Sequence, residues 1–485
     1  MPRKGGSKVY DEVNEALLSG EEDRSRSPLR ERPRRTPLPM VQLSVLFFFS
    51  VAEPLTSSCI YPFINKFVSE LDIIGGDKKK VGYYAGFIES LFFAAEALFV
   101  LHWSRVSDRI GRKPVLLVGI AGLCVSMVCF GLSRTYLGLV LSRCLVGALN
   151  GNLGVIKSMI AELTDETNMA QGYALLPVMW SLGSTIGPLV GGMLSRPHDH
   201  WPETFSAPFW LKYPYFLPCA VVSAVAAAIF LVTAMVLKET VKKPEPSSAD
   251  PERFDSSRNN SSHHEDTQQQ LPVRALLTYP ILLSVASYAM LAILDIAYRA
   301  MQPLFLSTPI KLGGLGLTPA SIGALLSAFG MLNGIFQALY FPRIIERFGV
   351  RLVYLVGICM FVILYSMFPL INYAATVGGV NVVVWFLLVL QLAVSVAVDM
   401  AYGCTFMYIA AAAPNKQSLG ATNGIAQLAA SILRAIGPAM STSLFAASVE
   451  NNWLGGNAVY VFLVALSVLC FWVLRRLPTE LWNKY

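Results

Sequence analysis

The sequence predicts an all-α membrane protein with twelve transmembrane helices arranged as two six-helix halves. Three observations support this fold class. Hydrophobic residues make up 54% of the 485-residue chain and charged residues only 14%, whereas soluble domains carry about 25% charged residues. Apolar runs of about 20 residues, long enough to cross a bilayer, recur along the chain. A polar stretch in the middle separates six such runs from six more.

The predicted domain boundaries follow this division. Residues 1–37 are polar and predict a disordered cytoplasmic tail. Residues 38–240 form the first six-helix half, and residues 241–274, rich in Pro, Ser, Asp, Gln and His, predict a disordered cytoplasmic linker. Residues 275–477 form the second half, and residues 478–485 a short tail. An even number of spans places both termini in the cytoplasm.

Composition also excludes several classes of function. We interpret the net charge of +7 as orientation charge near cytoplasmic helix ends and anionic lipid, not as a nucleic-acid surface. The eight cysteines are scattered without a C-x-x-C pair, so neither a metal site nor a disulfide framework is indicated. No nucleophile–base set or cofactor loop is present. We therefore expect no enzyme activity, no cofactor and no bound metal.

The expected spans alternate with short polar segments. In the first half they cover residues 41–67, 81–102, 115–132, 136–156, 171–194 and 213–237. In the second half they cover residues 280–305, 319–341, 352–371, 382–408, 419–447 and 459–474.

A basic segment at residues 103–114 separates spans 2 and 3 and predicts a tight cytoplasmic loop. Its cations mark the cytoplasmic side by the positive-inside rule; they are Arg105, Arg109, Arg112 and Lys113. Gly111 permits a sharp turn, and Pro114 fits the first turn of the next helix. Asp108 is placed to pair with neighbouring arginines. The simpler alternative is an ordinary positive-inside turn.

Spans 4 and 5 carry small residues at regular spacing. In span 4, Arg143 is followed by glycine four and eight residues later, which places a cation and two close-packing positions on one helix face. The alternative is a packing helix whose arginine reaches one interface. Span 5 contains a Gly-Pro-rich unit that lets another helix approach closely; its members are Gly183, Gly187, Pro188, Gly191 and Gly192. Generic small-residue packing is the alternative there.

These three patterns together resemble signatures of the major facilitator superfamily, over about residues 39–477. The D-R-x-G-R-K-P loop is similar to the family loop that latches the two halves on the cytoplasmic face, although Ser104 stands where the family usually has glycine. The span-4 pattern resembles a motif implicated in proton coupling. The span-5 pattern resembles the signature of exporters that exchange substrate against protons. Shorter segments look like a fungal branch related to zinc-induced-facilitator-like carriers and drug:proton antiporters.

Proton-coupled transport requires an ionisable group inside the membrane, and such groups are costly unless they serve a function. Glu53, near the middle of span 1 beside Pro54, is the first candidate; Asp399 and Asp295 follow, and the resemblance adds Arg143. For Asp295 the alternative is a simple pair with Arg299, four residues along the helix.

Other residues are candidates for a substrate cavity. They are Glu89, Trp180, Tyr288, Tyr402 and Arg434. Arg434 either holds an anionic substrate or neutralises Asp399, and the aromatic residues are alternatively packing or interfacial anchors. Glu96 is alternatively only a partner for the loop cations.

The leading hypothesis is a monomeric, multi-pass transporter that exports small organic molecules, multidrug substrates included, in exchange for protons by alternating access. Its expected partners are the substrate, protons and the lipid bilayer, in a plasma or vacuolar membrane. Two alternatives stay open. One is an uptake symporter or uniporter on the same fold, and the other is a membrane sensor that does not transport.

Overall fold

The computed structural model describes residues 36–164, 169–240, 277–414 and 419–479. The predicted linker 241–274 and nearly all of the two predicted tails lie outside these ranges. Secondary structure within the described ranges is helical throughout. The predicted all-α membrane fold is confirmed.

The helices of the first half follow the expected order with shifted ends. They are α2 Met40–Ile60, α3 Ile64–Ser69, α4 Val81–Ile110, α5 Arg112–Leu132, α6 Tyr136–Leu149, α7 Asn152–Leu163, α8 Met169–Leu194, α9 Pro197–His200, α10 Pro208–Lys212 and α11 Phe216–Val236. The second half contains α12 Tyr279–Ser307, α13 Pro319–Phe348, α14 Val350–Gly378, α15 Val382–Ala412, α16 Leu419–Glu450 and α17 Ala458–Leu474.

Ten helical segments among the described residues are long and apolar enough to cross a membrane, with α6 and α7 together forming one of them. Two shorter apolar stretches, Val178–Leu194 of α8 and Ala458–Leu474, have 17 residues or fewer. Both coincide with expected spans. The total of twelve spans stays a prediction, since length and composition establish ten.

Three expected elements differ in the structure. The predicted ten-residue loop is wrong, because α4 continues to Ile110 and α5 begins at Arg112. Only Gly111 separates them, with φ of 111°, a conformation that favours glycine. Charge marks where a span leaves the membrane, whereas the helix itself continues into water. Expected span 1 ends early at Ile60, and span 4 is interrupted between α6 and α7.

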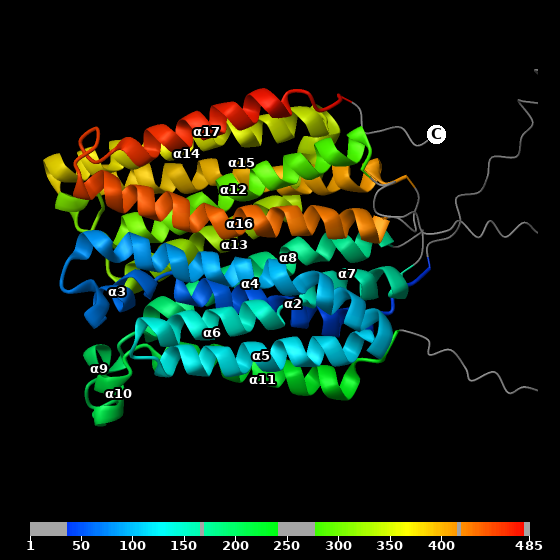
Figure 1. The fold of residues 1–485 in the computed structure, drawn as a ribbon, viewed down its shortest axis with the longest axis horizontal. Coiled ribbons are helices and arrows are strands. Elements are labelled where there is room, and N and C mark those ends of the chain that lie inside the picture. The colour runs from blue at the N-terminus through cyan, green and yellow to red at the C-terminus, as the bar shows by residue number, and fades with distance from the viewer. Residues whose placement is uncertain (1–35, 165–168, 241–276, 415–418, 480–485) are drawn as a thin grey trace, which may run out of the picture.

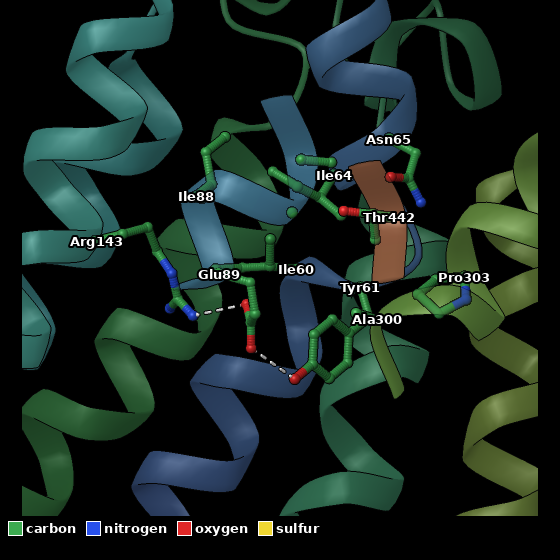
Figure 2. Close-up of a pocket in the computed structure, with 12 residues that line it drawn as sticks. Ile60, Tyr61, Ile64, Asn65, Ile88, Glu89, Arg143, Ala300, Pro303 and Thr442 are labelled. Carbon is green, nitrogen blue, oxygen red and sulfur yellow. Dashed lines mark hydrogen bonds and ion pairs between the residues drawn. The ribbon is translucent and has the colours of Figure 1, made fainter. Parts of the chain in front are cut away.

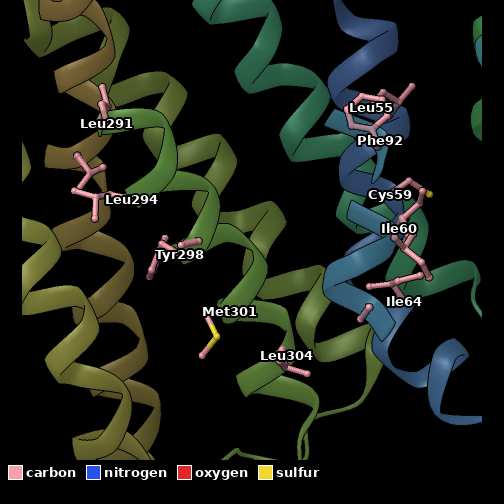
Figure 3. Packing of buried hydrophobic residues seen from close by; sticks show 14 of the residues in the cluster. Leu55, Cys59, Ile60, Ile64, Phe92, Leu291, Leu294, Tyr298, Met301 and Leu304 are labelled. Atoms are coloured by element: carbon pink, nitrogen blue, oxygen red, sulfur yellow. The ribbon is translucent and has the colours of Figure 1, made fainter. Parts of the chain in front are cut away.

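The chain enters and leaves the bundle at one end, and α3, α9 and α10 lie at the other (Figure 1). Between the halves, α8 packs along α13 and α4 along α16. Within the second half, buried side chains of α12 recur every three or four residues on one face, as Leu291, Leu294 and Tyr298 do in Figure 3. Buried apolar residues of both halves form one continuous cluster, and the main helix contacts between the halves are α8 with α13 and α4 with α16.

A polar cluster fixes the end of the bundle that carries α9. Arg196 Nη1 lies 2.7 Å from Glu70 Oε1 and its Nε lies 2.6 Å from Asp199 Oδ2. The Tyr215 hydroxyl donates to Glu70 Oε2 at 2.8 Å. These contacts tie the end of α3 to the start of α11.

Candidate functional site

The two halves meet through backbone contacts that leave little space between helices. Ser181 of α8 donates to the carbonyl of Gly330 in α13 at 2.9 Å. On the other side of the molecule, Ser90 of α4 accepts from the backbone N–H of Ala439 in α16 at 2.8 Å. Charged side chains between these two contact lines are therefore enclosed by both halves.

Glu53 lies on α2 between the halves. Its Oε1 accepts a hydrogen bond from Asn150 Nδ2 at 3.1 Å. Asn150 is at the break between α6 and α7, where the chain leaves helical geometry. Glu53 also interacts electrostatically with Arg434 of α16, in the other half. The first proton-carrier candidate is thus held by one half and faced by a cation of the other.

Glu96 of α4 belongs to the same place. Its side chain is 5% exposed and interacts electrostatically with both Glu53 and Arg434. Among the described residues, its Oε2 has no hydrogen-bond partner. The interpretation of Glu96 as a partner of the loop cations is therefore wrong. It precedes Arg105, the first of those cations, by nine residues of helix, which is roughly 13 Å along the axis and on the opposite helix face.

Lys157 is the fourth charged residue of this cluster, and the sequence analysis did not identify it as a candidate. Its Nζ lies 5.1 Å from the ring centroid of Phe406, which joins α7 of one half to α15 of the other. Lys157 also interacts with Arg434. The apolar segment reaches Ile160, so the expected end at residue 156 placed this lysine wrongly at the membrane surface. We call Glu53, Glu96, Lys157 and Arg434 the central polar site.

Three aromatic side chains of the second half adjoin the central polar site. Tyr288 lies under Arg434, with 5.7 Å from the guanidinium carbon to the ring centroid. Its hydroxyl is 3.4 Å from Arg434 Nη2. The rings of Tyr288 and Phe406 are 5.5 Å apart, and Tyr402 contacts both. We call these three residues the aromatic cluster. Trp180, by contrast, is 43% exposed on α8.

Asp295 and Asp399 of the second half are neutralised by one shared cation. Arg299 Nε lies 2.8 Å from Asp295 Oδ2, and its Nη2 lies 2.8 Å from Asp399 Oδ1. Asn333 and Tyr402 donate to these carboxylates, each at 2.7 Å. The alternative of an Asp295–Arg299 pair is present in the structure, whereas the expected neutralisation of Asp399 by Arg434 is wrong.

Arg143 pairs with Glu89 rather than with Glu53. Its Nη2 lies 3.3 Å from Glu89 Oε2, and the Tyr61 hydroxyl donates to the other Glu89 oxygen at 3.0 Å. Figure 2 shows this chain of contacts beside a small pocket that Thr442 and Pro303 of the second half also line. Arg143 is 3% exposed and lies over the ring of Phe92. This pair is therefore a second buried charge site, separate from the central polar site.

The residues of the basic segment join helices of the first half. Arg112 Nη2 lies 3.0 Å from Glu162 at the end of α7. Glu239, just beyond α11, accepts from the backbone N–H of Arg112 at 2.8 Å and of Lys113 at 3.0 Å. The partial positive charge at the N-terminus of α5 stabilises a carboxylate at this position. Arg109 is exposed, and the side chain of Asp108 lies outside the described part of the structure.

The small residues of span 5 allow close backbone contacts on two sides of α8. A Cβ atom on Gly183 would lie 2.6 Å from Pro54, and one on Gly187 would lie 2.6 Å from the Leu55 carbonyl. Gly191 lies against Cys59 in the same way. Gly192 faces Pro319 of the second half, and Pro188 lies on the same helix. The unit therefore presses α8 against the helix that carries Glu53 and against α13.

Two helical halves with buried charges between them are typical of one class of protein, the membrane transporters. A model of the Major Facilitator Superfamily matches residues 46–314 and 288–484. The chain belongs to this superfamily and is a membrane transporter.

Its relatives lie in the predicted branch. The major facilitator-type transporter psiT2 of Psilocybe cyanescens is 30% identical over 97% of each chain. The efflux pump azaK of Aspergillus niger is 30% identical over 93% of this chain and 91% of its own. The Arabidopsis thaliana protein ZINC INDUCED FACILITATOR-LIKE 1 is 29% identical over 89% and 90%.

A solved structure has the same fold. The human organic anion transporter MFSD10 superposes with a TM-score of 0.60 at 19% identity, covering 90% of this chain and all of its own.

Proposed function

We propose that the protein exports small organic molecules in exchange for protons. The observation that carries this proposal is the meeting of two carboxylates of one half, Glu53 and Glu96, with Arg434 of the other half. An ionised carboxylate away from water needs a counter-charge or a proton. The acids therefore have three ways to be satisfied: Arg434, a proton, or a cationic group of a substrate.

Alternating access couples these options. When the halves rock, Arg434 moves with the second half, whereas Glu53 and Glu96 move with the first. The counter-charge is then withdrawn, and protons or substrate must replace it. Because both compete for the same carboxylates, binding one releases the other, which is the requirement for exchange.

The direction of transport has support from two sources. The span-5 unit resembles the signature of exporters, and it packs against the helix that carries Glu53. Among the relatives, azaK of Aspergillus niger is named an efflux pump. An uptake symporter or uniporter is the alternative, and the following experiment separates uniport from proton-coupled transport.

The test uses purified protein in sealed vesicles that contain a pH-sensitive dye and an imposed pH gradient. Lipophilic cations, organic anions, zwitterions and metal chelates are added in turn. We expect one class to dissipate the gradient in the unchanged protein, and we expect Glu53→Gln and Glu96→Gln to abolish this response. Glu203→Gln, on an exposed loop, is the matched control. Substrate flux that is independent of proton movement would replace exchange by uniport.

A further inference from the structure

We propose that the central polar site binds a zwitterionic aromatic compound. The two acids bind its ammonium group, the two cations bind its acidic group, and the aromatic cluster receives its ring. The inference rests on the proposed function at the same site and names the chemistry of the substrate.

Charge balance is the first argument. The central polar site contains two acids and two cations, drawn from α2, α4, α7 and α16. A ligand with only a negative charge meets repulsion from Glu53 and Glu96, and one with only a positive charge meets repulsion from Arg434 and Lys157. A zwitterion adds no net charge to an enclosed site and offers each group an opposite charge.

The exchange of substrate for protons is the second argument. Ammonium groups and protons compete for the same two carboxylates, so amine binding displaces protons. A simple anion at Arg434 would instead favour protonated Glu53 and Glu96, and it would therefore bind together with protons. Exchange thus requires the amine, and the paired cations give the ligand's acidic group its partner.

The aromatic cluster is the third argument. Its rings lie directly beside the two cations, with Arg434 over Tyr288 and Lys157 over Phe406. Phe406 keeps 38% of its surface exposed although it lies at the contact between the halves. An aromatic ring of a ligand would stack edge to face or offset on this surface.

Unsatisfied polar atoms nearby are the fourth argument. In the described part of the chain, the buried atoms Glu96 Oε2, Gln427 Nε2 and Ser431 Oγ have no hydrogen-bond partner. Gln427 and Ser431 precede Arg434 on α16 by seven and three residues, hence on nearly the same helix face. Gln427 accepts from Tyr288, within the aromatic cluster. Buried polar atoms are normally paired, and a ligand with both donors and acceptors would pair these.

The experiment uses four probes that differ in one property at a time. Phenylalanine is the zwitterion, 2-phenylethylamine lacks the acid, and 3-phenylpropionate lacks the amine. 3-Cyclohexylalanine keeps both charges without the aromatic ring. Affinity for the purified full-length protein is measured by the ligand-dependent rise in melting temperature. We expect phenylalanine to bind at least about tenfold more tightly than either singly charged probe, since a charge-assisted contact is lost in each, and more tightly than 3-cyclohexylalanine.

Variants identify which group recognises which charge. We expect Arg434→Gln to abolish the preference for phenylalanine over 2-phenylethylamine, and Arg434→Lys to retain it, which also controls for folding. Phe406→Leu should remove the preference for the aromatic ring only. A singly charged probe that binds as tightly as phenylalanine, or no binding by any of the four, overturns the inference.

Failure of the proposed function is a separate result. If phenylalanine binds with this preference but moves without protons, the zwitterion site stands and the exchange mechanism falls. If 2-phenylethylamine alone is exchanged for protons and the exchange requires Glu53, the mechanism stands and the zwitterion inference falls.

Discussion

Glu53 and Arg434 are separated by 380 residues in the chain and interact across the boundary between its two halves. One sits on α2, fixed by Asn150, and the other on α16, beside Tyr288. Any relative movement of the halves changes this interaction directly. It therefore links the position of the helices to the charge that the site can hold.

Removing the support of Glu53 should impair transport without unfolding the protein. Asn150→Ala deletes the 3.1 Å hydrogen bond to Glu53, and a hydrogen bond to a charged group contributes about 1.5–3 kcal/mol. We expect at least a tenfold loss of substrate-driven proton movement in vesicles. Asn451→Ala, at the exposed end of α16, is the control. Full activity of Asn150→Ala would mean that Glu53 needs no such support.

Breaking the acidic cluster of the second half should act on stability first. Arg299→Met leaves Asp295 and Asp399 without their shared cation, and stranding buried charges costs about 3 kcal/mol or more. We expect a lower melting temperature and little monodisperse protein. Asp399→Asn keeps its contact with Asn333 possible and should be milder. A well-folded Arg299→Met that has lost only proton coupling would assign this cluster to the mechanism instead.

Close contact between α2 and α8 can be tested with a single methyl group. A Cβ atom on Gly191 would overlap the backbone of Cys59, whereas one on Gly154 has nothing within 4 Å. Gly191→Ala should therefore lower the melting temperature, as overpacking costs about 1–3 kcal/mol. Gly154→Ala is the matched control and should be neutral or stabilising. Equal melting temperatures would contradict this prediction, because they would show that the contact accommodates a methyl group without cost.

Glu239 should stabilise the start of α5. It accepts two backbone hydrogen bonds there, and losing a helix cap costs about 0.5–2 kcal/mol. We expect Glu239→Ala to lower the melting temperature more at low than at high salt, because the charge–dipole part is screened. Glu203→Ala, on an exposed loop, should change neither value. A salt-independent loss would assign the effect to packing.

Tyr215 predicts a dependence of stability on alkaline pH. Burial, and then the neighbouring Glu70 carboxylate, raise the pKa of Tyr215 above its ordinary value of 10.0. A raised folded pKa favours the neutral form, so its contribution is complete below pH 10 and is lost as the pH rises further. The decrease in melting temperature from pH 8 to pH 11 should be smaller in Tyr215→Phe than in the unchanged protein. An equal fall in both would contradict this prediction.

The sequence predicted the fold class well because hydrophobicity over about 20 residues depends on the bilayer alone. Glu53 was found for the same reason, as an acid far from either end of its span. The partners of Glu96 and the position of Lys157 inside a span were missed because helix ends were taken from the ends of the apolar runs. α4 in fact extends eight residues beyond the expected end at residue 102, and the span of Lys157 ends at Ile160.

Pairings between side chains of different helices could not be predicted from spacing. Asp295 and Arg299 are one helical turn apart, so their contact follows from local geometry. The partners of Arg143 and Arg434 come from other helices, and the rotation and height of those helices decide them. Glu89, not Glu53, reaches Arg143 because Gly147 lets α6 lie against α4 at that level.

Gly111 alone separates α4 from α5, so the two helices cannot move far independently of each other. Glu239 and Glu162 bind the start of α5 to the end of α11 and to α7. A tilt of α4 would therefore shift α5, α7 and α11 together. We therefore expect the first half to move as one rigid unit. In that case, a change of charge at Glu96 and a displacement at Gly111 would each move the same set of helices.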